Sequence, residues 1–174
     1  MTATMYPHPY RVLFLCTGNS ARSIMAEALL NVLGHGRFEA FSAGSRATGR
    51  VQPMAAAFAT GLGYPAERLR SKSWDEFARE GAPTMDFVIT VCDNAAGETC
   101  PVWFGSPVTA HWGVPDPAIV AGDESQRRAA YRDAAELLRK RVEAMVALPD
   151  AQLSGPKARD SLQEIGRMGM EPRA

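Results

Sequence analysis

The segment formed by residues 11–22 constrains the fold of this chain more than any other. Its apolar run, Val12 to Cys16, is short and does not alternate with polar residues, which is typical of a strand buried on both faces of a parallel sheet. A turn of small and polar residues follows at once. Residues 23–33 then carry apolar side chains at spacings of three and four, as an amphipathic helix does. The order of strand, tight turn and helix predicts a layered α/β fold.

The same alternation of strands and helices continues along the chain. Apolar runs predict further strands at residues 38–42, 87–92 and 108–111, and helical patterns lie at 52–61 and 73–79. Asp123 and Gln126 have the spacing of a capping box that opens a long amphipathic helix. This order predicts a doubly wound, four-stranded parallel sheet with helices on both faces. In such sheets ligands bind beyond the carboxyl ends of the strands.

Length and charge limit the organisation and the partners of the chain. Its 174 residues suit one compact domain, which we expect at residues 1–148, followed by a helical extension at 149–174. The 19 basic and 19 acidic residues leave no net charge, so we expect neither nucleic acid nor a membrane as partner. No apolar run approaches the ~18 residues of a membrane span, and no secretory signal is recognisable. We therefore expect a cytoplasmic protein.

The chain has three cysteines, Cys16, Cys92 and Cys100. An odd number without an export signal makes a poor disulfide framework. Cys92 and Cys100 match none of the short zinc-ligand spacings, so we expect no bound metal at them. Redox chemistry and simple burial in the core remain as alternatives for these thiols.

The pattern C-x5-R-S at residues 16–23 lies between the first strand and the first helix, where a tight turn can cradle an oxyanion. Backbone N–H groups of the turn and the positive end of the helix both attract a tetrahedral anion. Arg22 adds a planar fork for two oxygens, and the same positive surroundings should depress the pKa of Cys16 and make it a nucleophile. The predicted substrate-binding residues are Thr17, Gly18, Asn19, Ser20, Ala21, Arg22 and Ser23.

Three polar side chains complete this predicted site. Ser23 can donate a hydrogen bond to the Cys16 thiolate, and Asn19 can brace the turn through its amide. Asp116 is the candidate general acid, because Pro115 and Pro117 hold it in a loop at the same edge of the sheet. The alternative is that Asp116 only shapes a turn and that Cys16 is an inert core residue.

Four short motifs together resemble the low-molecular-weight tyrosine phosphatase superfamily over residues 10–148. They are C-T-G-N-S-x-R-S at 16–23, M-A-E at 25–27, S-A-G at 42–44 and D-P-A at 116–118. Within that superfamily, V-C-D-N-A-A-G-E-T-C-P at 91–101 and H-W-G-x-x-D-P at 111–117 look like the arsenate reductases that couple to thioredoxin or a related thiol donor.

The resemblance implies a relay of three thiols. Cys16 would attack arsenate held by the loop and Arg22, while Asp116 protonates the departing oxygen. Cys92 would then attack the sulfur of Cys16 and expel arsenite, and Cys100 would attack Cys92 in turn. No bound cofactor is implied. An external reductant of the thioredoxin or glutaredoxin type would be required, and phosphate or sulfate would compete with arsenate.

The chain departs from the family pattern at several positions. Ala21 replaces the second cysteine that the phosphatases usually carry in the loop, and Ala118 replaces an aromatic residue after the acid. Both departures favour the reductase. The spacing from Cys92 to Cys100 is one residue longer than in some reductases, which bears on the last thiol exchange.

In some relatives a monovalent cation lies near the residues that match Asn19, Glu27 and Ser42. We find no clear acidic fourth ligand for such a cation around residues 73–75.

Two other functions remain open from the residues. A phosphatase acting on phosphotyrosine or a small phosphate ester would need only Cys16, Arg22 and Asp116, since arsenate and phosphate share shape and charge. A non-catalytic protein that binds the oxyanion without turnover is the third reading. Neither the oligomeric state nor the identity of the thiol donor follows from the sequence.

Overall fold

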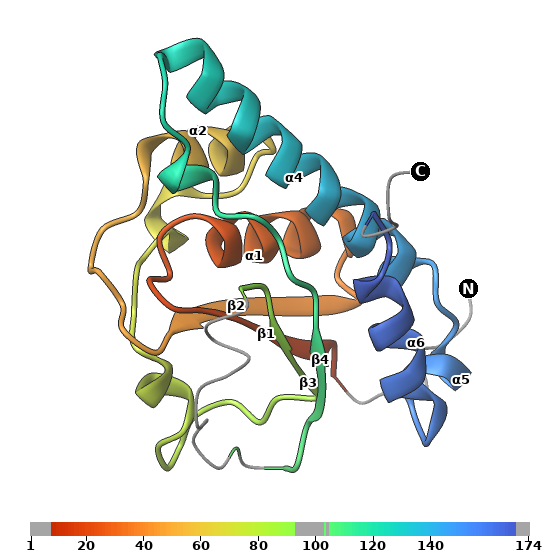
Figure 1. Ribbon diagram of the computed structural model, residues 1–174. Helices are drawn as coiled ribbons and strands as arrows, with labels where there is room; N and C mark the ends of the chain where they lie inside the picture. Colours follow the sequence, from red (N-terminus) through yellow and green to blue (C-terminus); the bar gives the residue numbers. More distant parts are fainter. Residues whose placement is uncertain (1–7, 93–102, 104, 170–174) are drawn as a thin grey trace.

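A single parallel sheet organises the chain in the computed structural model, which describes residues 8–92, 103 and 105–169 (Figure 1). Its strand order is β2-β1-β3-β4, and every neighbouring pair is parallel. The prediction of a four-stranded parallel sheet is confirmed. The strands are β1 (Tyr10–Cys16), β2 (Phe38–Gly44), β3 (Phe87–Thr90) and β4 (Val108–His111).

The helices agree with the sequence signals that predicted them. Pro53 occupies the first turn of its helix, and Asp123 and Gln126 form the predicted capping box. The α-helices are α1 (Arg22–Leu33), α2 (Pro53–Gly61), α4 (Glu124–Val146), α5 (Asp150–Leu153) and α6 (Lys157–Gly166). The short 3-10 helices are η1 (Ala66–Arg68), η2 (Trp74–Phe77) and η3 (Pro117–Ile119).

The two faces of the sheet are covered unequally. Side chains of β1 alternate between them: Val12 and Phe14 belong to the larger apolar cluster, and Leu13 and Leu15 to a smaller one. Helices α1, α2 and α4 lie on the first side of the sheet (Figure 1). The second side carries η2, whose Phe77 packs into the smaller cluster. The helix predicted at residues 73–79 is therefore a single 3-10 turn, and a thin layer covers this face.

The strand order reverses direction at β1, because β2 lies on one side of it and β3 on the other. The carboxyl end of β1 is therefore the switch point where open α/β sheets bind ligands. The register pairs Leu15 with Thr90, and the backbone N–H of Val91 still donates to the Leu15 carbonyl at 2.9 Å. The strand predicted at 87–92 ends at Thr90, two residues before Cys92.

Helix α6 packs against the edge strand β4, α5 packs against α6, and both helices bury side chains in the larger apolar cluster. Leu153, Leu162 and Ile165 are buried in the cluster that also contains Val12. The indole N–H of Trp112, which directly follows β4, donates to the Leu162 carbonyl at 2.8 Å. The predicted C-terminal extension is thus packed onto the core that holds the site.

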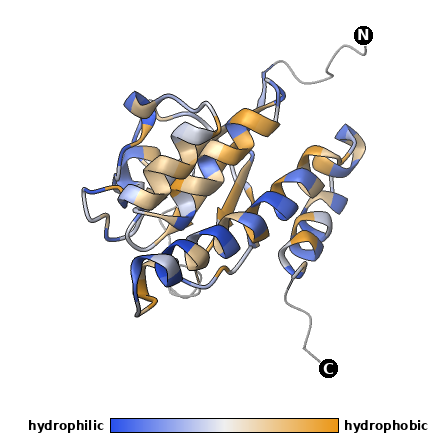
Figure 2. Ribbon diagram, turned by 90° about the horizontal axis from the view of Figure 1, so that it is seen from above, coloured by the Kyte–Doolittle hydropathy of each residue, from blue (hydrophilic) through white to orange (hydrophobic). Residues whose placement is uncertain are grey.

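The long helix α4 is amphipathic, with hydrophilic stretches interrupted by apolar positions (Figure 2). Its buried residues include Tyr131, Leu138, Val142 and Met145. Although α4 has 23 residues, no helix within the described residues is both long and apolar enough to cross a bilayer.

We predict that Leu162→Ala lowers the free energy of unfolding by about 2 to 5 kcal/mol, because it removes a fully buried side chain from the core. Urea unfolding followed by circular dichroism measures the change. The control Glu164→Ala, at an exposed position of the same helix, should stay within about 0.5 kcal/mol of the wild type. An unchanged midpoint for Leu162→Ala would show that α6 unfolds separately from the sheet.

Candidate active site

The loop between β1 and α1 turns its carbonyl groups away from its concave side. Each of four carbonyls accepts a hydrogen bond from a segment that follows β2. The pairs are Cys16 with Ser45 (3.3 Å), Thr17 with Arg46 (2.9 Å), Gly18 with Thr48 (3.0 Å) and Ser20 with Gln52 (2.8 Å). The described residues contain no cis peptide bond. In a trans peptide unit the N–H points opposite to the C=O, so the N–H groups of residues 17, 18, 19 and 21 face the other way. These N–H groups line the concave side of the loop, which we call the cradle; that it binds an anion stays a prediction.

The start of α1 adds to this cradle. Ala21 is the N-cap residue, and among the described residues no side chain caps the helix. The first N–H groups of a helix have no partner within it, and they carry the positive end of its dipole. Both features favour an anion in front of α1.

Asn19 holds the loop in its turned conformation. It is fully buried and has a φ of 48°, in the left-handed region that Asn tolerates better than most residues. Its amide nitrogen donates to the Ser23 hydroxyl at 2.8 Å, and its amide oxygen accepts from the backbone N–H of Lys72 at 2.9 Å. Asn19 thus braces the turn as the sequence suggested. Ser23 was expected to donate a hydrogen bond to Cys16. The hydrogen bond that its hydroxyl makes in the structure is the one accepted from the Asn19 amide.

Arg22 and Asp116 meet at the mouth of the loop, although 94 positions separate them in the sequence. One guanidinium nitrogen of Arg22 lies 3.4 Å from a carboxylate oxygen of Asp116, and another donates to the Val114 carbonyl at 2.9 Å. The other carboxylate oxygen of Asp116 accepts from the Ala118 N–H at 2.9 Å and so caps η3. Asp116 therefore both shapes its turn and faces the cradle. Its position is compatible with a structural role in the turn and with the role of general acid.

Two thiols lie together at this edge. Cys16 ends β1 and is 4% exposed, and Cys92 follows β3 and is 3% exposed. Their side chains are within hydrogen-bonding distance of each other, and the Thr17 hydroxyl lies 3.5 Å from the Cys92 sulfur. Cys100, the third predicted thiol, lies outside the described residues.

The expected depression of the Cys16 pKa is wrong for this arrangement. The hydrogen bond with Cys92 and burial raise the pKa of Cys16, while the charge of Arg22 and the Thr17 N–H act in the opposite direction. The local sequence shows the positive groups of the loop. It does not show that a second thiol from a distant strand lies against Cys16.

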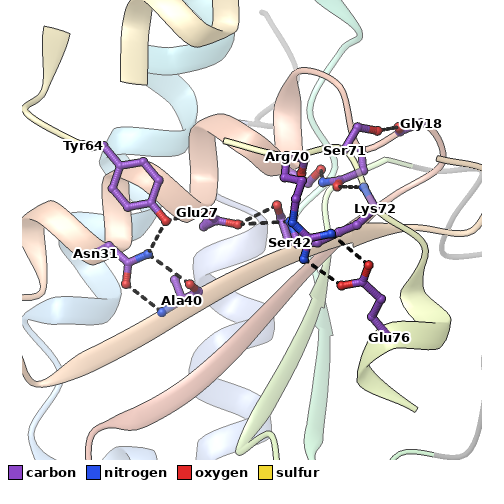
Figure 3. A network of polar contacts seen from close by, with 12 residues as sticks. Gly18, Glu27, Asn31, Ala40, Ser42, Tyr64, Arg70, Ser71, Lys72 and Glu76 are labelled. Atoms are coloured by element: carbon purple, nitrogen blue, oxygen red, sulfur yellow. Dashed lines mark hydrogen bonds and ion pairs between the residues drawn. The ribbon is translucent and has the colours of Figure 1, made fainter. Parts of the chain in front are cut away.

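A buried polar network supports the loop from below, between α1 and β2 (Figure 3). Glu27 of α1 accepts a hydrogen bond from the Ser42 hydroxyl at 2.7 Å, and the Lys72 ammonium lies 3.8 Å from the same carboxylate oxygen. The second carboxylate oxygen accepts from the Tyr64 hydroxyl. Sequence reasoning grouped Asn19, Glu27 and Ser42 but missed Lys72 and Tyr64, because both lie in irregular segments with no periodic pattern.

Comparisons with known proteins agree with this geometry. The family model described as low molecular weight phosphotyrosine protein phosphatase matches residues 11–155. A curated arsenate reductase of Halalkalibacterium halodurans is 33% identical over 131 residues, which are 75% of this chain and 91% of that protein.

Two solved structures are similar as well. An arsenate reductase in the phosphate binding state has a TM-score of 0.63 and 26% identity, covering 83% of this chain and 99% of that one. For an arsenate reductase from Archaeoglobus fulgidus the TM-score is 0.55 and the identity 30%, covering 76% of this chain and 98% of that one.

We predict that Cys92→Ala lowers the pKa of Cys16, because it removes the hydrogen-bonding thiol that contributes most to raising it. The rate of alkylation of Cys16 by iodoacetamide, measured against pH by mass spectrometry, should shift its midpoint to lower pH. Cys100→Ala also leaves two thiols in the chain and shows whether the shift is specific to Cys92. An unmoved midpoint in Cys92→Ala would contradict the contact between the two thiols.

Proposed function

The chain belongs to the low molecular weight phosphotyrosine protein phosphatase family, and from that premise we propose that it acts as an arsenate reductase. The observation that carries the proposal is the contact between the Cys16 and Cys92 thiols at the anion cradle. A phosphatase needs the cradle, Cys16, Arg22 and an acid, and the hydrolysis itself does not require a second thiol from another strand. A reductase needs a second thiol that attacks the Cys16 sulfur and forms a disulfide with it.

Binding of arsenate uses the features of the loop. The inward N–H groups and the start of α1 hold its oxygens, and the guanidinium of Arg22 can hold two of them at once. Phosphate and sulfate have the same tetrahedral shape and compete for the cradle. The solved relative in the phosphate binding state supports this part of the proposal.

The first chemical step joins sulfur to arsenic. The Cys16 sulfur attacks the arsenic atom, and one As–O bond breaks. Asp116, held 3.4 Å from Arg22 at the mouth of the loop, supplies the proton with which the departing oxygen leaves as water. Arsenic remains As(V) in this step.

The second step carries the reduction. The Cys92 thiolate attacks the Cys16 sulfur, an S–S bond forms, and the S–As bond breaks. The electron pair of that bond stays on arsenic, which leaves as arsenite, As(III). Two thiols have then been oxidised to one Cys16–Cys92 disulfide, which balances the two electrons gained by arsenic.

The last steps restore Cys16. Cys100 attacks the Cys92 sulfur, releases Cys16 and leaves a Cys92–Cys100 disulfide. An external dithiol of the thioredoxin or glutaredoxin type then reduces that disulfide, and no bound cofactor takes part. A reducing compartment such as the cytoplasm, where such donors keep thiols reduced, suits this cycle.

We predict that Cys92→Ser and Cys16→Ser separate the two chemistries. Cys16→Ser loses arsenate reduction and any hydrolysis of an aryl phosphate, because a serine hydroxyl is a poor nucleophile at neutral pH. Cys92→Ser loses arsenate turnover but keeps phosphate binding and any aryl phosphate hydrolysis, because the cradle is intact. Arsenite release with thioredoxin and its reductase, beside an aryl phosphate assay and phosphate calorimetry, measures all three properties.

Two results would contradict the proposal. One is sustained arsenate turnover by Cys92→Ser. The other is a wild-type protein that hydrolyses the aryl phosphate but releases no arsenite with any thiol donor.

A further inference from the structure

The carboxylate of Glu27 is a buried acidic group that is linked to the anion cradle through Lys72. It is 4% exposed, on the face of α1 that packs toward β2 (Figure 3). Ser42 and Tyr64 donate hydrogen bonds to its two oxygens. Hydroxyl donors alone leave the negative charge uncompensated, and a buried charge without an opposite charge is costly.

Lys72 supplies the opposite charge from inside the protein. Its ammonium lies 3.8 Å from the Glu27 carboxylate and donates to the Arg70 carbonyl at 2.9 Å. The two side chains are only 7% and 5% exposed. Burial lowers the pKa of Lys72, and the Glu27 carboxylate works against that change. This pair is thus shielded from solvent, unlike the exposed ion pair of Arg128 and Glu124.

The same residue also holds the loop through its backbone. The Lys72 N–H donates to Asn19, and its carbonyl accepts from the N–H of Gly44 at 2.9 Å. The neighbouring Ser71 hydroxyl donates to the Gly18 carbonyl at 3.0 Å. Lys72 therefore joins Glu27 of α1, the end of β2 and the left-handed residue of the cradle.

We propose that the Lys72 ammonium is the built-in monovalent cation of this site, so that the cradle is held in its anion-binding shape without K⁺. The oxygens that a bound cation would use already have partners. The Glu27 oxygens face Ser42, Lys72 and Tyr64, and the Asn19 oxygen faces the Lys72 N–H. A second positive charge beside the ammonium would also be repelled. These residues do not fit a bound cation, and Lys72 is a positioning residue that acts through Asn19 and Glu27.

The test compares cations at constant ionic strength, with choline replacing K⁺. Phosphate affinity is measured by isothermal titration calorimetry, and the melting temperature is measured by differential scanning calorimetry. In the wild type, both should be the same in K⁺ and in choline. This arm needs no variant, and neither readout needs arsenate turnover, so it stands even if the proposed reductase activity fails.

Two substitutions at Lys72 then separate the effect of its charge from the effect of its side-chain volume. Lys72→Ala leaves a gap beside Glu27, and in choline it should weaken phosphate binding by about 10- to 100-fold, the usual effect of losing a supporting polar contact. Addition of K⁺ or ammonium should restore most of that loss, because a small cation can enter the gap. Lys72→Met fills the gap without charge, so it should show the same loss and no recovery. The exposed Lys140→Ala should behave as the wild type.

Three results of these experiments would overturn the proposal. A wild-type protein whose phosphate affinity rises with K⁺ would show that a cation binds beside Lys72. Equal phosphate affinity in Lys72→Ala and the wild type, in choline, would show that the ammonium does not position the loop. Equal recovery of Lys72→Ala and Lys72→Met in K⁺ would show a general salt effect. If the protein reduces arsenate, its turnover in the Lys72 variants should change in parallel with their phosphate affinity. Only this comparison rests on the proposed function.

Discussion

The parallel pairing of β1 with β3 is the constraint on which the site depends. It aligns Leu15 with Thr90, and the bond from Val91 to Leu15 extends the pairing to the carboxyl end of β1. Cys16 and Cys92, each just beyond the paired residues, are thereby brought to hydrogen-bonding distance at the switch point of the sheet. Two thiols at the ends of adjacent parallel strands therefore meet without any special loop. For the proposed reductase, the sheet itself would place the two thiols for exchange.

The shape of the anion cradle depends on a second, non-local constraint. The loop turns its N–H groups inward because the segment after β2 takes up its carbonyls. That segment can approach so closely because Gly44 ends β2: a Cβ there would lie 2.4 Å from the Thr17 carbonyl oxygen and 3.0 Å from the Asn19 nitrogen. The Lys72–Glu27 pair supports the same region from below. The loop, the end of β2 and the buried pair therefore form one connected unit.

Local patterns predicted the order of elements and part of the site. The uninterrupted apolar run before Cys16, the Pro53 helix start and the capping box of Asp123 depend on neighbours in sequence, and all were found. The pKa direction of Cys16 and the role of Lys72 could not be predicted in this way. Each depends on a partner far away in the chain, Cys92 for the thiol and Glu27 for the lysine. The helix predicted at residues 73–79 was found only as the shorter 3-10 helix η2, which buries Phe77 in the smaller apolar cluster.

The central claim is that Cys92 forms a disulfide with Cys16 when arsenate is reduced. The direct measurement is disulfide mapping by mass spectrometry of Cys100→Ser after one addition of arsenate without external thiol. The account predicts about one arsenite released per chain and a Cys16–Cys92 disulfide, because no third thiol is present to move the bond onward. Arsenite release that leaves Cys16 and Cys92 unbridged would contradict it.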